Sequence, residues 1–138
     1  MIMYSSALLL FLIEIAMQIA AQVLIGLVCL IHIYIFLLET VWFKKRGAKV
    51  FGIPRAEVEM RAVAMSNQGC YIGFLAAACL LGLMYPNRAI ATAFATLGLT
   101  WVAVAGIWSA VTVMVRILYI ETVPAVLGLM ALCFVTPA

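Results

Sequence analysis

The chain has 138 residues, of which 69% are hydrophobic and only 9% are charged, and its formal net charge is +3. A soluble domain is about half apolar and about a quarter charged, so this composition excludes an ordinary water-soluble fold and indicates an integral membrane protein. The length allows one domain, residues 1–138. Six of the eight basic residues lie in residues 44–61. No second basic face could follow a phosphate backbone, and we expect no nucleic-acid partner.

The first apolar run, residues 5–43, is about twice the roughly 20 residues that cross a ~30 Å hydrocarbon layer. It fits an interfacial segment before one span, one long tilted helix, or two short spans joined near Gly26. We prefer one span over residues 21–43, preceded by a helical extension over residues 1–20. No Lys or Arg occurs in the first fourteen residues, so we expect no cleavable signal peptide.

Three further spans are predicted after the basic loop, over residues 62–85, 89–114 and 118–136. The last long apolar run is divided at Arg116, because a charged side chain is costly at mid-bilayer, and Pro124 suits the first turn of a new helix. The sequence therefore predicts an all-α fold, a four-helix transmembrane bundle with a helical N-terminal extension.

The orientation follows from the basic residues, which accumulate on the cytoplasmic side of membrane proteins. We expect loop 44–61 in the cytoplasm and both termini outside, in a bacterial inner membrane.

Polar residues of the first run form a stripe. At 100° per residue they share an arc of roughly 100° on one helix face: Glu14, Gln18, Gln22, His32 and Glu39. The stripe predicts that this face avoids lipid, and its partner could be a helix, another subunit or a ligand.

A candidate ligand site lies in the inner half of the bundle. The helical rise places Glu39 and Asn67 about 6 to 8 Å inside the boundary, and His32 and Tyr71 about 14 to 16 Å inside. With Gln68 they form the predicted ligand-binding set, which Arg116 and Glu121 would close. The same polar residues are also explained if they form interhelical hydrogen bonds that only stabilise the bundle. Both interpretations stay open.

His32 is the only histidine, which excludes a site with several histidines within one chain. It could supply a single axial ligand to haem or chlorophyll. No metal site and no other cofactor is predicted. A proton relay along Glu14, His32 and Glu39 is a further possibility. No arrangement of a nucleophile and its base occurs, so we assign no catalytic residue.

Small residues predict close helix packing, within one protomer or between protomers. They are Gly69, Gly73 and Ala77 in the second predicted span, and Gly106 and Ala110 in the third.

Several segments carry a family resemblance: residues 30–42 (LIHIYIFLLETVW), 49–53 (KVFGI), 67–77 (NQGCYIGFLAA), 105–107 (AGI) and 124–125 (PA). From about Ala20 onward the chain resembles the membrane family called domain of unknown function 1304. The resemblance implies a compact four-span bundle and no established activity. Ile72 stands where the family pattern has an asparagine, and about fifteen residues precede the similar region.

The sequence favours a non-enzymatic protein, either a homo-oligomer or an accessory subunit of a larger membrane complex, surrounded by membrane lipids. The alternative is a membrane-embedded binding or catalytic site for a small or lipid-like molecule. The proton relay is the third hypothesis.

Overall fold

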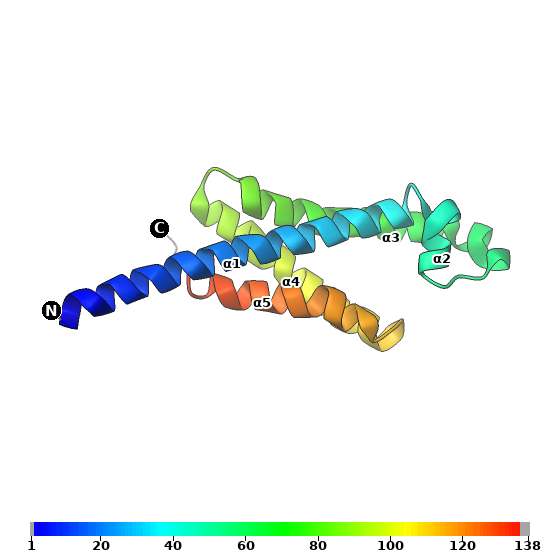
Figure 1. The fold of residues 1–138 in the computed structure, drawn as a ribbon. Coiled ribbons are helices and arrows are strands. Elements are labelled where there is room, and N and C mark those ends of the chain that lie inside the picture. Colours follow the sequence, from blue (N-terminus) through cyan, green and yellow to red (C-terminus); the bar gives the residue numbers. More distant parts are fainter. Residues whose placement is uncertain (1, 136–138) are drawn as a thin grey trace.

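The computed structural model of the chain describes residues 2–135, and side chains from Leu8 onward. All elements in this part of the chain are helical (Figure 1). The long ones are α1 (Ile2–Glu39), α3 (Val58–Met84) and α4 (Arg88–Thr112), and the shorter ones are α2 (Ala48–Val50) and α5 (Val123–Leu132). Two π-helical segments, η1 (Phe43–Gly47) and η3 (Leu118–Thr122), and a 3₁₀ turn, η2 (Arg55–Glu57), lead into neighbouring helices. The predicted all-α fold is confirmed.

α1 is one unbroken helix of 38 residues, about 57 Å long at 1.5 Å per residue. No hairpin forms near Gly26, so the extension and the predicted first span are one helix. The helix ends at Glu39 rather than at residue 43, because η1 turns back onto it. Gly47 lies directly against the carbonyl oxygen of Leu38, and a side chain there would overlap it.

α3 and α4 form a helical hairpin close to the predicted positions. α3 begins at Val58, earlier than residue 62, because η2 continues directly into it. α4 starts at Arg88, where the Asn87 side chain accepts a hydrogen bond of 3.1 Å from the Ile90 backbone N–H. This bond satisfies one of the amide groups that a helix start leaves open.

The last predicted span, residues 118–136, is shorter than expected. Three helices are long and apolar enough to cross a membrane, whereas Leu118–Leu132 is a shorter apolar segment. It consists of η3 followed by α5, with Pro124 in the first turn of α5. The helix ends at Leu132, and residue 136 lies outside the described part. Its 15 residues rise about 22 Å, less than the ~30 Å hydrocarbon layer.

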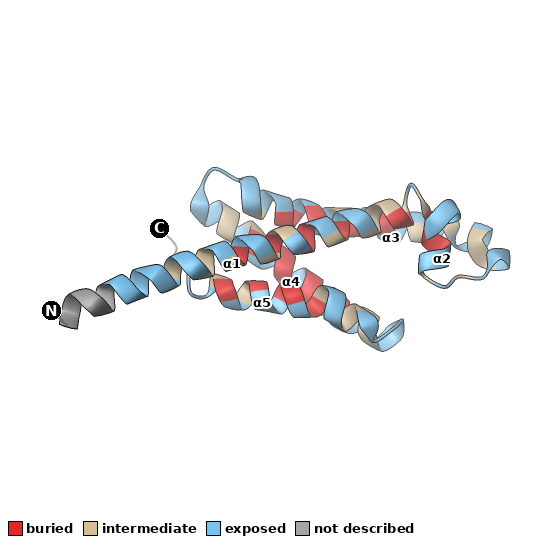
Figure 2. Ribbon diagram, in the orientation of Figure 1, coloured by how far each residue is buried: buried red, intermediate tan, exposed pale blue. Residues whose placement is uncertain are grey.

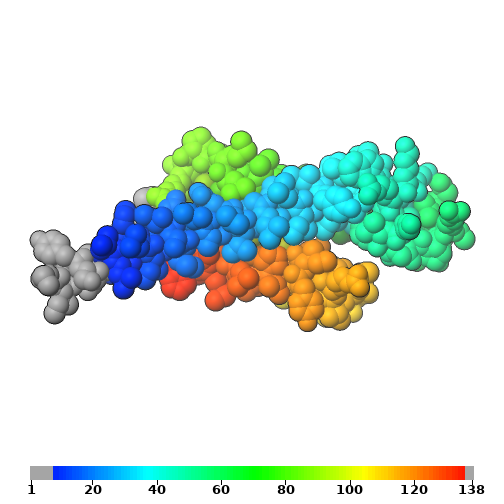
Figure 3. Space-filling model, viewed as in Figure 1, coloured from blue at the N-terminus to red at the C-terminus, as the bar shows by residue number. Residues whose placement is uncertain are grey.

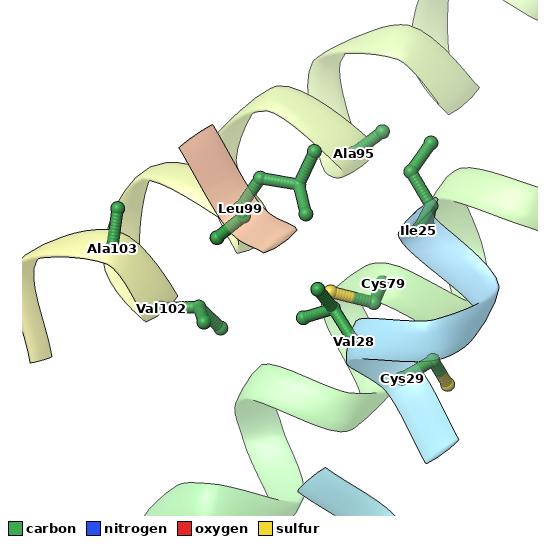
Figure 4. Close-up of a cluster of buried hydrophobic side chains, with 9 residues drawn as sticks. Ile25, Val28, Cys29, Cys79, Ala95, Leu99, Val102 and Ala103 are labelled. Atoms are coloured by element: carbon green, nitrogen blue, oxygen red, sulfur yellow. The ribbon is translucent and has the colours of Figure 1, made fainter. Parts of the chain in front are cut away.

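α1 packs against α3 and α5, and α4 packs against the same two helices, so α1 and α4 lie on a diagonal with little contact. The apolar core between them contains Ile25, Val28 and Cys29 of α1 and Leu99 and Val102 of α4 (Figure 4). Ala95 and Ala103 of α4, Cys79 of α3 and Ala125 of α5 complete it. The four helices of the predicted bundle therefore share one core.

α1 extends past the ends of the other helices (Figures 1 and 3). Gly26 lies beside Leu83, 4.0 Å from its Cδ1 to a Cβ built on the glycine, and α3 ends one residue later at Met84. None of residues 8–20 is buried, and Ala21 is the first buried residue among the described side chains of α1 (Figure 2). We call residues 8–20 the overhang.

Large apolar side chains cover the outside of the bundle, among them Val63, Phe74, Trp108 and Val111, each more than 60% exposed. Such a surface is unfavourable in water, because exposing apolar area to water costs about 25 cal/mol per Å². Together with the three long apolar helices, this surface indicates a membrane protein.

Candidate functional site

His32 is a fully buried polar residue of α1, with 0% exposure. Its Nδ1 lies 2.9 Å from the backbone carbonyl oxygen of Val28, one turn earlier. A carbonyl oxygen only accepts, so Nδ1 carries the proton and a neutral ring presents Nε2 as an acceptor. Nε2 is buried and has no partner among the described residues. The interior therefore holds an acceptor that could take a proton or a donor group.

Glu39, seven residues further along nearly the same face of α1, is 6% exposed, and its Oε2 also lacks a partner in the described structure. α3 approaches closely here. A Cβ on Gly69 would lie 2.9 Å from the Glu39 Cβ and 2.7 Å from the Thr40 Cγ2. Such distances leave room for hydrogen only, so Gly69 allows the helix contact that encloses Glu39.

Glu121 and Thr122 of η3 bring polar groups to the same end of the bundle. A Cβ built on Gly106 of α4 would lie 3.2 Å from the Glu121 Cβ. Thr122 is buried, and its hydroxyl donates to the Ala103 carbonyl oxygen at 3.4 Å. Gly106 of α4 faces this hydroxyl, which a side chain at that position would overlap. Sequence reasoning overlooked Thr122, whose position beside a small residue of another helix depends on the fold.

The α3 members of the predicted ligand-binding set lie elsewhere. Asn67, Gln68 and Tyr71 are exposed, and Tyr71 packs edge-on against Phe74 with ring centroids 6.3 Å apart. The face of α3 that contacts α1 instead carries Gly69, Gly73 and Ala76. The structure thus brings His32 and Glu39 inside and does not bring Asn67, Gln68 or Tyr71 to them, because the glycine face of α3 takes that position. Ile72, the departure from the family pattern, is a buried apolar residue of α3.

The other predicted positions divide between packing and exposure. Gly73 lies against the Phe36 ring of α1, with 3.1 Å from a built Cβ to Cδ2. Ala77 is exposed and Ala110 is half-buried. On the overhang and just after it, Glu14 and Gln18 are half-buried and Gln22 is exposed. Arg116 is exposed, and neither ion pair of the described side chains includes it.

An open groove of about 790 Å³ lies between η1 and the first turns of α3. Polar and charged residues line it, namely Thr40, Lys44, Lys45, Ser66 and Asn67, together with Val41, Phe43, Ala62, Val63 and Cys70. Of the predicted ligand-binding set only Asn67 lines this groove. The sequence identified the two lysines as part of the basic loop, but it did not show that η1 folds back beside α3.

Within the described residues no group of three or more His, Cys, Asp or Glu side chains could hold a metal ion. His32 is completely enclosed, so a porphyrin could reach Nε2 only by displacing packed helices.

A family model described as "Protein of unknown function (DUF1304)" matches residues 26–133. The chain belongs to this family. No curated protein and no solved structure matches the chain in the same comparisons. The match to the family begins at Gly26, where α1 comes level with the end of α3. The matched region is thus the packed bundle, and the overhang precedes it.

Proposed function

We propose that this member of the family is a non-enzymatic membrane protein that assembles with a second copy of itself through the overhang of α1. The observation that carries the proposal is that α1 continues past the bundle with apolar side chains on all sides. Residues 8–13 are all large, apolar and exposed. A helix that is apolar all round requires lipid or protein around it.

Lipid alone does not suit the whole overhang in either orientation of α1: apolar residues enter water in one, and polar side chains enter lipid in the other. If α1 stands upright with the bundle, its 38 residues exceed the ~30 Å hydrocarbon layer and the apolar residues 8–13 enter water. If α1 tilts so that these residues stay in lipid, then Glu14, Gln18 and Gln22 enter lipid as well. An unpaired amide or carboxyl is costly there.

A second copy contributes to both requirements, because it would cover one side of residues 8–13 and offer polar partners to the stripe. Residues 8–13 would cover their counterparts, and fully burying one such side chain contributes roughly 1.5 to 3 kcal/mol relative to water. A glutamine amide both donates and accepts, so Gln18 and Gln22 of two copies can pair across a twofold axis. Interhelical bonds of this kind contribute about 0.6 to 2 kcal/mol each in membranes.

The mass of the full-length protein in mild detergent, measured by native mass spectrometry, tests this proposal. We expect a dimer, and Gln18→Leu combined with Gln22→Leu should weaken dimerisation about tenfold or more, from the loss of two polar contacts. Gln68→Leu is the matched control, because it removes an exposed amide from α3. A protein that is monomeric at every concentration, or a control that weakens the dimer equally, would refute the proposal.

The buried atoms His32 Nε2 and Glu39 Oε2 support a second candidate, a proton relay along α1. Liposomes that contain the protein would then pass protons faster than empty ones, and Glu39→Gln would abolish the difference. Glu59→Gln serves as the control, because Glu59 lies on the exposed surface where it pairs with Lys44. Equal flux in the wild type and in Glu39→Gln would eliminate this candidate.

A further inference from the structure

We propose that the groove between η1 and α3 binds one phospholipid with an anionic headgroup. The proposal rests on the membrane embedding proposed above but does not depend on the dimer. The groove lies where the apolar part of α1 ends and the basic segment begins, which is where headgroups meet a membrane protein.

The groove has a charged end and a deeper end lined by both polar and apolar side chains. Lys44 extends to Glu59, at the start of α3, over a distance of 2.6 Å between Nζ and Oε2, which fixes the charged end. Thr40 lies against Gly69 and fixes the opposite end, deeper along α3. Between Ala62 and Cys70 the helix rises about 12 Å. From the charged end, α3 lines the groove first with Ala62 and Val63, then with Ser66 and Asn67, and then with Cys70, so polar and apolar side chains lie beside one another along it.

The polar groups available at the charged end suit a phosphate. Glu59 already neutralises Lys44, whereas Lys45 belongs to neither ion pair of the described side chains. Ser66 and Asn67 follow on the groove face of α3 and can donate to phosphate or ester oxygens. The Thr40 hydroxyl is engaged, because it donates to the Phe36 carbonyl oxygen at 2.6 Å. Lys45, Ser66 and Asn67 are therefore the headgroup contacts.

The apolar members of the lining suit an acyl chain. Val41 and Val63 are 65% and 81% exposed, and the buried Phe43 is the first residue of η1. A chain lying along them would remove apolar area from the water that reaches this end of the bundle. A free phosphate would use the lysine and the polar side chains only, so the exposed valines beside them favour a lipid.

The experiment is native mass spectrometry of the full-length protein with two lipids that have the same acyl chains, phosphatidylglycerol and phosphatidylcholine. We expect one phosphatidylglycerol to remain bound preferentially. Lys45→Gln should weaken this binding about fivefold, the usual contribution of one basic residue near an anionic surface. Asn67→Leu should weaken it as well. Both side chains are exposed, so the variants should fold.

Lys49→Gln is the matched control, because Lys49 is exposed in the same basic loop but does not line the groove. Equal losses in Lys45→Gln and Lys49→Gln would overturn the proposal in favour of diffuse loop charge. Equal retention of the two lipids would overturn it too, as would displacement of the lipid by an equal concentration of inorganic phosphate. The same spectra report the dimer mass, so failure of the lipid site and failure of self-assembly are distinguishable.

Discussion

The two parts of α1 differ in burial although both are strongly apolar. The packed part, from Ala21 to Glu39, contributes Ile25 and Val28 to the core, whereas none of residues 8–20 is buried. The packed part meets helices that carry glycine at the contact, such as Gly69 and Gly73 of α3. Apolar character takes a helix into the membrane, but small residues on its neighbours decide where it packs.

The largest expected effect is on the glycine contact that distinguishes the packed part. Gly69→Ala would force a methyl group to within 3 Å of Glu39 and Thr40. We therefore expect the free energy of unfolding to fall by about 3 kcal/mol, the upper end of the range for overpacked cores. Gly26→Ala is the matched control, because the atom nearest to a Cβ built there, Leu83 Cδ1, is 4.0 Å away. Thermal unfolding in detergent measures the stability of both variants. Equal unfolding midpoints would contradict a role for the Gly69 contact in packing α3 against α1.

Leucine truncation at the two ends of α1 compares the parts directly. Leu38 is 1% exposed and Leu10 is 67% exposed. Leu38→Ala should lower the free energy of unfolding by about 2 kcal/mol, the lower end of the range for a leucine-to-alanine cavity. The value is low because on unfolding this side chain moves into lipid rather than into water. Leu10→Ala should cost under about 0.5 kcal/mol in the monomer. The same unfolding measurement applies, and a larger loss at Leu10 would show that the overhang packs within its own protomer.

The smallest effect concerns the buried hydroxyl near the end of the packed part. Thr122→Val removes the 3.4 Å bond to Ala103 and should cost about 0.6 kcal/mol. The control Thr112→Val removes a bond of 2.8 Å to Trp108 within the same helix, and should have no measurable effect. A loss at Thr122 as large as that for Gly69→Ala would mean that polar contacts, rather than close packing, hold the bundle.

The sequence was sufficient for the all-helical fold and for most helix boundaries. Composition, Arg116 and Pro124 divide the chain where η3 and α5 begin, and apolar length predicts α3 and α4. The shortness of α5 was not predictable, because apolar residues continue past Leu132 where the helix ends.

The candidate site was predictable only in part. Helical periodicity puts His32 and Glu39 on one face, and both are buried. The same periodicity puts Asn67 and Tyr71 on one face of α3 without saying which face meets α1. The glycine face of α3 forms that contact because it permits a closer approach, so Asn67 and Tyr71 are exposed. The groove depends on η1 folding back at Gly47, which no local pattern signals.

Disulfide cross-linking in native membranes tests self-assembly through the overhang most directly. In a chain with Cys70→Ala and Cys133→Ala, which removes the exposed thiols, Gln18→Cys would be oxidised and compared with Leu97→Cys, an exposed position on α4. Two thiols bridge only when their Cβ atoms come within about 4.5 Å. We predict a covalent dimer from Gln18→Cys and monomer from Leu97→Cys. Monomer from both variants, or dimer from both to the same extent, would contradict self-assembly through the overhang.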